Sequence, residues 1–463
     1  MDVLIVLAAL AFLMVAAYRG ASVIVFAPVA ALAAVMLTSP AMVLPFYSAV
    51  FMERLAGFVK LYFPVFLLGA VFGKLIETSG FARSIIAAVT GAVGSEKAML
   101  AIVIVGALLT YGGVSLFVVA FAVYPFAAEL FRAADIPKRL IPATIGLGAF
   151  TFTMDALPGT PQIQNIIPSS FFKTDAWAAP RLGIIGGIFV FAAGMAYLEW
   201  RRRQARTAGE GYGTGHRNEP ESPVSERLAS PLVALAPLVA VGVLNKIFTA
   251  AIPARYGASV DLSAAGVTAE KIDVSKTAAL WAVEAALVAA IVLVIVTAFR
   301  RVRPAFHAAI GAAVAGAMLA AMNTGSEYGF GAVISSLSGF RAVNDFLVGA
   351  IRDPLLSAAI TTTALAGMTG SASGGMSIAL AAMGAAYLEQ ARTAGIPAEV
   401  LHRVTAMASG GMDSLPHNGA IITLLAVTGL THAESYRDIF ALTLIKTAAV
   451  FVVIGVYYLT GIV

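Results

Sequence analysis

One short motif occurs twice in the sequence, and each copy places an aspartate and a proline inside strongly apolar sequence. Met154-Asp155-Ala156-Leu157-Pro158 returns almost unchanged as Met412-Asp413-Ser414-Leu415-Pro416, 258 residues later (412 minus 154). A carboxylate inside a membrane is unfavourable, and a proline ends the helix that precedes it. Because both features recur at matching places of two halves, they predict a binding site between two repeats.

The composition predicts a protein that crosses a membrane several times. Of the 463 residues, 60% are hydrophobic and only 12% are charged, and the mean hydropathy is +0.90. Stretches long enough to cross a bilayer as helices recur at about 2–18, 21–38, 61–76, 181–199, 229–249, 277–297, 305–322 and 439–461. We therefore expect an all-α polytopic membrane protein. The net charge of +5 forms no basic stripe, so no nucleic-acid partner is expected, and the absence of cysteine excludes disulfides and thiolate metal sites.

Three basic sites predict the orientation in the membrane. Arg19 follows the first apolar stretch, and the densest groups of arginine lie at 201–206 and 300–303. Since lysine and arginine concentrate on the cytoplasmic side, these sites are expected in the cytoplasm and both chain termini on the opposite side. The polar stretch 201–228, rich in Gly, Glu, Pro and Ser, predicts a disordered cytoplasmic loop between the halves 1–200 and 229–463.

The similarity between the halves extends beyond the motif. Further segments match in the same order and at similar offsets: 79–81 with 338–340, 112–115 with 374–377, and 129–137 with 389–397. The basic sites predict that 21–38 runs outward and that its repeat mate 277–297 runs inward. Opposite directions predict two inverted-topology repeats, with a pseudo-two-fold axis in the membrane plane.

Each half contains a glycine- and hydroxyl-rich segment between two apolar flanks. The segments lie at about 110–115 and 369–377, and each flank has about a dozen residues, too few to span a bilayer alone. A re-entrant helical hairpin with the segment at its tip fits this pattern, because non-helical backbone at this depth must line protein or a water-filled cavity. The predicted substrate contacts at the tips are Tyr111, Gly112, Gly113, Ser115, Ser371, Ser373, Gly374, Gly375 and Ser377.

A second interruption follows each aspartate and predicts a broken transmembrane helix, at about 155–165 and 413–419. The N-terminus of the restarting helix offers N–H groups to an anion, and the ends of the interrupted helix offer carbonyl groups to a cation. The predicted substrate contacts here are Gly159, Thr160, Gln162, Asn165, His417, Asn418 and Gly419. No arginine or lysine lies in these segments or in the hairpin tips, which favours a small hydroxylated monoanion over a multiply charged acid.

Asp155, Asp413 and His417 are the candidate proton-coupling residues. Each aspartate could instead accept hydrogen bonds that stabilise the broken helix, or bind a cation. His417 could likewise make a structural hydrogen bond, and its counterpart in the first half is Gly159, so any role of His417 is asymmetric. Lys446, near the inner end of its apolar stretch, is expected to extend its ammonium group towards the membrane surface.

Two pairs at matching places, Glu129 with Arg132 and Glu389 with Arg392, have the (i, i+3) spacing of ion pairs at helix ends. Glu284 lies inside an apolar stretch without a charged repeat mate.

The two interrupted segments, 153–165 and 408–420, resemble the gluconate permease (GntP-type) family, which belongs to the ion transporter superfamily. The resemblance covers essentially the whole chain, and the second segment is especially similar to permeases annotated for 3-hydroxybutyrate. It implies proton-coupled uptake of small hydroxy acids across the bacterial inner membrane. In that membrane the orientation predicted from the basic sites places both termini in the periplasm, and no cofactor is expected. The superfamily implies a homodimer, in contact with membrane lipid, whose transport domains move against scaffold domains in an elevator mechanism. The Ser-Asn-Thr signatures of sodium-dependent members are absent from the hairpin tips and breaks.

Other classes of membrane protein share parts of this sequence pattern. An intramembrane aspartyl protease needs two buried aspartates, but its second aspartate usually follows Gly-x-Gly, whereas Gly410-Gly411-Met412 precedes Asp413. A sodium-coupled organic-anion symporter and a passive channel or facilitator stay open, because hydroxyl and carbonyl ligands are present and inverted repeats occur in channels too. Accumulation against a gradient separates a symporter from a channel.

Overall fold

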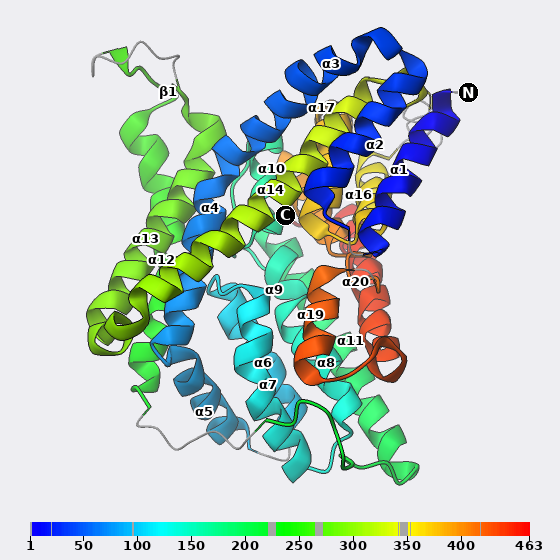
Figure 1. The fold of residues 1–463 in the computed structure, drawn as a ribbon. Coiled ribbons are helices and arrows are strands. Elements are labelled where there is room, and N and C mark those ends of the chain that lie inside the picture. Colours follow the sequence, from blue (N-terminus) through cyan, green and yellow to red (C-terminus); the bar gives the residue numbers. More distant parts are fainter. Residues whose placement is uncertain are drawn as a thin grey trace.

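A computed structural model describes residues 2–19, 21–94, 97–220, 228–263, 272–340, 353–416 and 418–463, together with residues 342 and 351. Nearly all regular structure in these residues is helical (Figure 1). The helices before residue 208 are α1 (Asp2–Tyr18), α2 (Val23–Thr38), α3 (Val43–Phe46), α4 (Glu53–Thr78), α5 (Phe81–Val93), α6 (Ala98–Tyr111), α7 (Leu116–Ala133), α8 (Ile141–Ala149), α9 (Phe152–Asp155), α10 (Ile163–Phe172) and α11 (Pro180–Thr207). Those that follow are α12 (Pro231–Tyr256), α13 (Val274–Val302), α14 (Phe306–Ser336), α16 (Pro354–Thr369), α17 (Ala372–Thr393), α18 (Ala398–Ser409), α19 (Gly419–Thr428) and α20 (His432–Thr460).

The predicted multi-pass architecture is confirmed. Within the described ranges, five helical stretches are long and apolar enough to cross a membrane: Pro40–Thr78, Pro180–Thr207, Pro231–Tyr256, Thr277–Ser336 and His432–Thr460. A short antiparallel pair of strands, β1 (Ser259–Val260) and β2 (Ile272–Asp273), lies at the end of the α12–α13 pair. This pair falls in the stretch between two membrane helices.

Small residues let the long helices α4 and α14 cross closely. A β-carbon on Gly325 would lie 3.5 Å from the carbonyl oxygen of Leu55 in α4, and one on Gly329 would lie 2.9 Å from that of Phe51, in the helical segment Tyr47–Met52 that leads into α4. Glycine therefore brings the two backbones together, as is common between helices in membranes. The same two helices also approach the hairpins through glycine. Gly73 of α4 meets Ser115 at the start of α7, and Gly331 of α14 meets Ile378 of α17.

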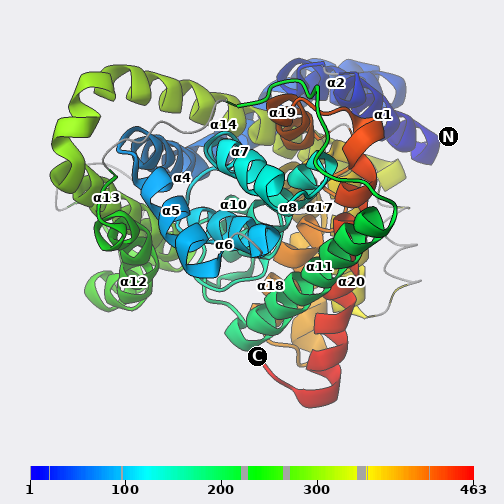
Figure 2. The same ribbon diagram turned by 90° about the horizontal axis from the view of Figure 1, so that it is seen from below.

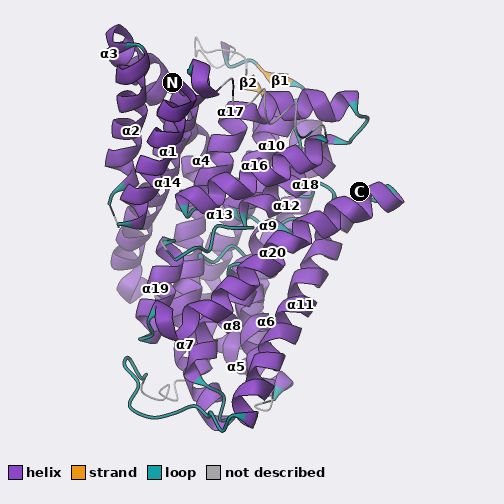
Figure 3. Cartoon of the chain, turned by 90° about the vertical axis from the view of Figure 1, so that its right-hand side faces the viewer, coloured by secondary structure: helices purple, strands orange, loops and turns teal. Residues whose placement is uncertain are grey.

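Two helical hairpins, α6–α7 and α16–α17, lie in opposite halves of the molecule. Figures 1 and 3 show α16 and α17 in the upper half, α6 and α7 in the lower half, and α9 between them. The first turn comprises residues 112–115 and requires Gly113 at φ +96°. The second comprises only Gly370 and Ser371, with Gly370 at φ +65°. The predicted tip 369–377 was therefore too long, because Ser373, Gly374, Gly375 and Ser377 already belong to α17.

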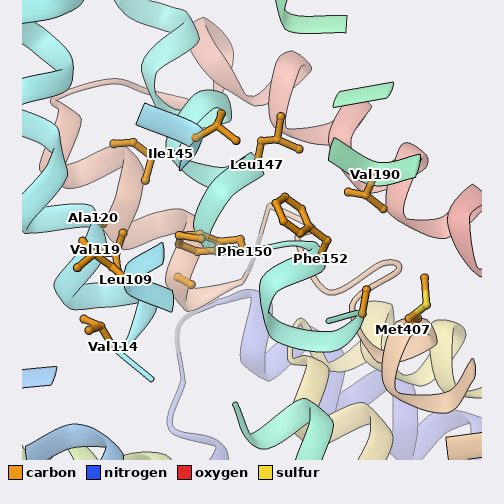
Figure 4. Packing of buried hydrophobic residues seen from close by; sticks show 14 of the residues in the cluster. Leu109, Val114, Val119, Ala120, Ile145, Leu147, Phe150, Phe152, Val190 and Met407 are labelled. Atoms are coloured by element: carbon orange, nitrogen blue, oxygen red, sulfur yellow. The ribbon is translucent and has the colours of Figure 1, made fainter. Parts of the chain in front are cut away.

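The hydrophobic core surrounds the short helix α9. Figure 4 shows Phe150 and Phe152 next to Leu147 of α8 and Val190 of α11. Seen from below, α11 and α20 lie side by side along this core (Figure 2). Because apolar side chains fill the region, a charged group inside it is expected to have its partner in the protein.

The polar stretch between the halves differs from the expected disordered loop. Residues up to Thr207 continue helix α11, and residues 208–220 contact the ends of the hairpin and motif helices. Tyr212 is buried and its backbone N–H donates to Asp135 Oδ1 (2.8 Å), while Lys138 Nζ donates to the carbonyl oxygen of Arg217 (2.7 Å). Buried partners therefore order a segment whose composition alone predicts disorder. Residues 221–227 lie outside the described ranges.

Candidate functional site

The first break connects α9 to α10 through residues 156–162. Gly159 adopts φ +80° and leaves no room for a side chain, because a β-carbon there would lie 2.5 Å from the indole of Trp177. Its N–H donates to the carbonyl oxygen of Ala176 (2.8 Å). The amide of Asn165 donates to the carbonyl oxygens of Thr160 (3.0 Å) and Ala176 (2.9 Å). The side chains of Asn165 and Trp177 and the backbone of Gly159 thus fix the path of the interrupted segment.

The second break extends from residue 410 to residue 418, between α18 and α19. Asn418 caps α19, since its Oδ1 accepts from the N–H groups of Ala420 (2.7 Å) and Ile421 (2.9 Å). Its amide nitrogen donates to the carbonyl oxygen of Asp413 (2.9 Å). Gly419 is exposed at the first position of α19, and His417 lies outside the described residues.

Within each half, one side-chain amide joins the hairpin tip to the break. Gln162 Nε2 donates to the carbonyl oxygen of Thr110 (2.7 Å), and Asn418 Nδ2 donates to that of Gly370 (2.8 Å). The first half has a second connection, from the hydroxyl of Tyr111 to the carbonyl oxygen of Pro158 (2.8 Å). The predicted site residues therefore meet in two groups, one in each half.

Two charged side chains connect the second break to the first. Lys446 of α20 is buried and its ammonium group lies 3.0 Å from Asp413 Oδ1. The same group donates to the carbonyl oxygen of Phe150 (2.9 Å), which ends α8 just before the first motif. The expectation that Lys446 reaches the membrane surface is wrong, because a free carbonyl oxygen and a carboxylate bind its ammonium group in the interior.

Asp155 approaches the same place from the other break. Its side chain is buried, and its Oδ2 occupies the space where a β-carbon on Gly410 would lie. The ammonium nitrogen of Lys446 lies 3.1 Å from that position. Gly410, the first residue after α18, thus lets both motif aspartates share the neighbourhood of one lysine.

A second buried cation, Arg403 of α18, was not found by sequence analysis. Its guanidinium donates to the carbonyl oxygen of Asp155 (2.8 Å), to Asn165 Oδ1 (2.9 Å) and twice to the carbonyl oxygen of Ala178 (2.8 and 3.2 Å). Although the break segments contain no arginine or lysine, the fold brings one of each to them from α18 and α20. The argument for a small monoanion considered only cations within these segments, whereas Arg403 and Lys446 reach the breaks from other helices. A charge in a mostly apolar helix ten residues before the second aspartate was the available signal.

Asp155, Asp413, Arg403 and Lys446, which we call the charge cluster, contain two carboxylates and two cations. Such a balanced set can remain inside a membrane protein, whereas removal of one partner leaves an uncompensated charge. Beside it is a cavity of about 10 Å³, lined by Ser414, Thr443 and Lys446 among others. This volume suits about one water molecule and no organic substrate.

A much larger cavity, about 570 Å³, opens at the tip of the first hairpin. Tyr111, Gly112 and Trp177 line one side, and apolar residues of α12 line the other, with Lys246 as the charged residue of the lining. The ammonium of Lys246 lies 4.8 Å from the centre of the Trp177 ring, and Trp177 Nε1 donates to Asn245 Oδ1 (2.8 Å). A cavity with apolar walls and one cation has the chemistry to hold a small organic anion.

The remaining predicted site residues lie in different surroundings. Ser371 caps α17, since its Oγ accepts from the N–H of Gly374 (3.0 Å). Gly375 packs against the backbone of Ala366, and Ser115 is half-buried beside Gly73. The hydroxyl groups of Thr160 and Ser377 are buried and have no hydrogen-bond partner among the described residues.

The predicted helix-end ion pairs have two outcomes. Glu389 and Arg392 form the expected pair (2.6 Å), exposed to solvent. Arg132 pairs instead with Glu219 of the polar segment (3.3 Å).

Comparison with known proteins identifies the family. The chain is 57% identical, over 472 aligned positions that cover all of both sequences, to the uncharacterized transporter YxjC of Bacillus subtilis (strain 168). The chain belongs to this transporter family. No family model matches the sequence.

Among solved structures, the Alcanivorax borkumensis YdaH transporter is similar over 89% of this chain and 88% of that one, with a TM-score of 0.49 and 15% identity. A similarity at this level carries no inference about the present chain.

Proposed function

We propose that this transporter is a secondary active symporter that couples proton entry to the uptake of a small hydroxy-monocarboxylate across a bacterial inner membrane. The charge cluster is the observation that carries the proposal. The cluster joins both breaks, and its two carboxylates are balanced by its two buried cations. The cavity beside it has room for water but for no organic molecule. Such a cluster has the means to respond to a proton while substrate binds elsewhere.

The substrate class follows from the larger cavity and from the sequence resemblance. Its volume of about 570 Å³ is ample for a molecule of the size of 3-hydroxybutyrate or gluconate. One cation, Lys246, would favour one carboxylate, and the hydroxyl of Tyr111 and the backbone of the hairpin tip offer hydrogen bonds to substrate hydroxyl groups. The resemblance to gluconate permeases supports the same class.

An elevator movement is the mechanism that we propose. The two hairpins and the two breaks are joined by Gln162, Asn418 and the charge cluster, so they would move as one unit. Helices α4, α12, α13 and α14 would form the scaffold, and a homodimer would hold the scaffold still. The inverted arrangement of the halves, supported by the opposite placement of the hairpins in Figure 1, would supply two similar end states.

Uptake into proteoliposomes tests the proposal. Labelled 3-hydroxybutyrate and gluconate are offered under an inward proton gradient, an inward sodium gradient, or neither. We expect accumulation with the proton gradient alone. When one proton enters with each monoanion the step is electroneutral, and the ratio of internal to external substrate rises about tenfold per pH unit of the gradient. Accumulation driven only by sodium would overturn proton coupling, and equilibration without accumulation would indicate a facilitator.

Substitution of the motif aspartates then tests the charge cluster. Asp155→Asn and Asp413→Asn are expected to alter the pH dependence of uptake, whereas Glu389→Gln, on an exposed helix end, should not. If both asparagine variants kept the wild-type pH dependence, these carboxylates would not be coupling groups.

A further inference from the structure

Glu327 of α14 is a buried carboxylate that the charge cluster does not include. The residue is only 3% exposed and lies in the long apolar stretch Thr277–Ser336. Within the described part of the chain, no hydrogen bond or ion pair to its carboxylate is found. An unpaired carboxylate in such a place is unusual and calls for a functional explanation.

Glu327 meets the second hairpin at the first turn of α17. Its Oε2 occupies the space beside the α-carbon of Gly374, where any larger residue would collide with it. One turn earlier on α14, the hydroxyl of Thr324 lies 3.3 Å from that of Ser373. The carboxyl group therefore lies at the contact between α14 and the hairpin, and any movement of the hairpin away from α14 would expose it.

The repeated architecture does not require this carboxylate. Gly331 of α14 and Gly73 of α4 are related by the 258-residue offset of the motif (331 minus 73), and each packs against the second helix of its own hairpin. The residue one turn before Gly73, in the position of Glu327, is Gly69, and a β-carbon there would have no neighbour within 4 Å. Glu327 is thus specific to the second half.

The ionisable side chains on the elements packed against α14 do not neutralise Glu327. Helix α2 has none, and on α4 Arg54 is exposed while the hydroxyl of Tyr62 donates to the carbonyl oxygen of Ile167 (3.2 Å). The remaining charged ones on α4 and α17 are exposed at the surface or paired with each other: Glu53, Lys60, Lys74 with Glu77, and Glu389 with Arg392. The hydroxyl of the buried Tyr387 on α17 donates to Met383 Sδ (3.2 Å), and the ionisable residues of the short segments Tyr47–Met52 and Arg303–Ala305, Tyr47 and Arg303, are exposed. A charged carboxylate would therefore be uncompensated, which is far more unfavourable than burial of the neutral acid.

We propose that Glu327 is a proton-binding residue that controls the second hairpin. When Glu327 is a neutral acid, α17 can pack against α14. When Glu327 loses its proton, the carboxylate requires contact with water, and it gains that contact as the hairpin moves away from α14. The proton that binds Glu327 would then enter with the substrate and leave from the other side. This inference rests on the proposed proton coupling and assigns one carrier of the proton.

Glu327→Gln is the direct test, because glutamine resembles the neutral acid and cannot release a proton. In proteoliposomes we expect exchange of labelled for unlabelled substrate to continue, while the roughly tenfold proton-driven accumulation per pH unit falls to about one. Glu284→Gln, at a half-buried carboxylate of α13, is the matched control and should accumulate like the wild type. Accumulation by Glu327→Gln at the wild-type level would overturn the inference.

A measurement on the hairpin itself separates this inference from the proposed function. The chain contains no cysteine, so Ser373→Cys introduces a single thiol where α17 meets α14. The rate of maleimide labelling is divided by that of a small free thiol at the same pH, which corrects for the pH dependence of the thiol reaction. We expect this ratio to rise several-fold with pH and to become independent of pH when Glu327→Gln is added.

The two experiments give distinguishable failures. A wild type that shows no proton-driven accumulation contradicts the proposed function, yet the labelling ratio still tests Glu327. A ratio that rises with pH equally in the presence and absence of Glu327→Gln overturns the proton-binding role, even if the transporter is driven by protons. A variant that is retained in detergent with the wild-type elution profile shows that neither result comes from misfolding.

Discussion

Replacement of Lys446 by methionine tests whether this lysine stabilises the fold by charge compensation. The substitution keeps most of the side-chain volume but removes an ammonium group that lies 3.0 Å from Asp413 and 2.9 Å from the Phe150 carbonyl oxygen. Breaking a buried ion pair by removing one partner costs about 3–5 kcal/mol. Because the side chain of Asp413 is 13% exposed and water can reach it in part, we expect the lower end, about 3 kcal/mol.

The double variant Lys446→Met with Asp413→Asn separates charge from packing. It removes the uncompensated charge and loses only neutral hydrogen bonds, at about 1 kcal/mol each. We therefore expect it to be more stable than Lys446→Met alone by about 1–2 kcal/mol, roughly a factor of 5–30 in the unfolding equilibrium.

Equilibrium unfolding of the purified protein, followed by the fluorescence of its three tryptophans, measures these differences. Lys246→Met is the matched control, since that ammonium faces the ring of Trp177 and its loss should cost less than about 1 kcal/mol. If the double variant were as unstable as Lys446→Met or less stable, Lys446 would act through packing, and the reasoning about the charge cluster would be refuted.

Three further predictions concern the contacts around the breaks. Gly410→Ala should destabilise the protein by several kcal/mol in the same unfolding assay, because its β-carbon would collide with Asp155, whereas Gly419→Ala, with no neighbour within 4 Å, should be tolerated. Arg403→Lys should cost about 3 kcal/mol in thermal unfolding, since one ammonium cannot reach the three groups that the guanidinium joins, and a near-neutral result would contradict this. Gln162→Leu and Asn418→Leu should each slow substrate exchange at least tenfold while the folded protein is retained, and unchanged exchange rates would show that these amides do not couple tip to break.

The sequence was sufficient to predict a multi-pass helical membrane protein, because apolar runs act locally along the chain. It failed where distant segments meet. Lys446 was expected at the membrane surface because its hydrogen-bond partner, the Phe150 carbonyl oxygen, lies 296 residues away in the sequence. Arg403 was overlooked for the same reason, since its partners belong to the other half. Residues 208–220 are mostly polar or glycine, and tertiary contacts order them.

The buried charged groups near the two breaks and the second hairpin are distributed unequally over the two halves of the sequence. Glu327, Arg403 and Lys446 all belong to the second half, and at the motif offset they correspond to Gly69, Ile145 and Ile188, which carry no charge. Only the motif aspartates are shared, as Asp155 and Asp413.

If the halves were equivalent, exchange of their conformations would give two states of equal energy. Glu327 contacts the second hairpin and has no partner among the described residues. We therefore expect protonation to act mainly on that hairpin, and pH to control opening on its side of the membrane. Labelling of Ser373→Cys should therefore respond to pH on one side of the membrane only. If the labelling rate responded equally to pH on both sides, the charges would act on both hairpins and both breaks together, and not on the second hairpin in particular.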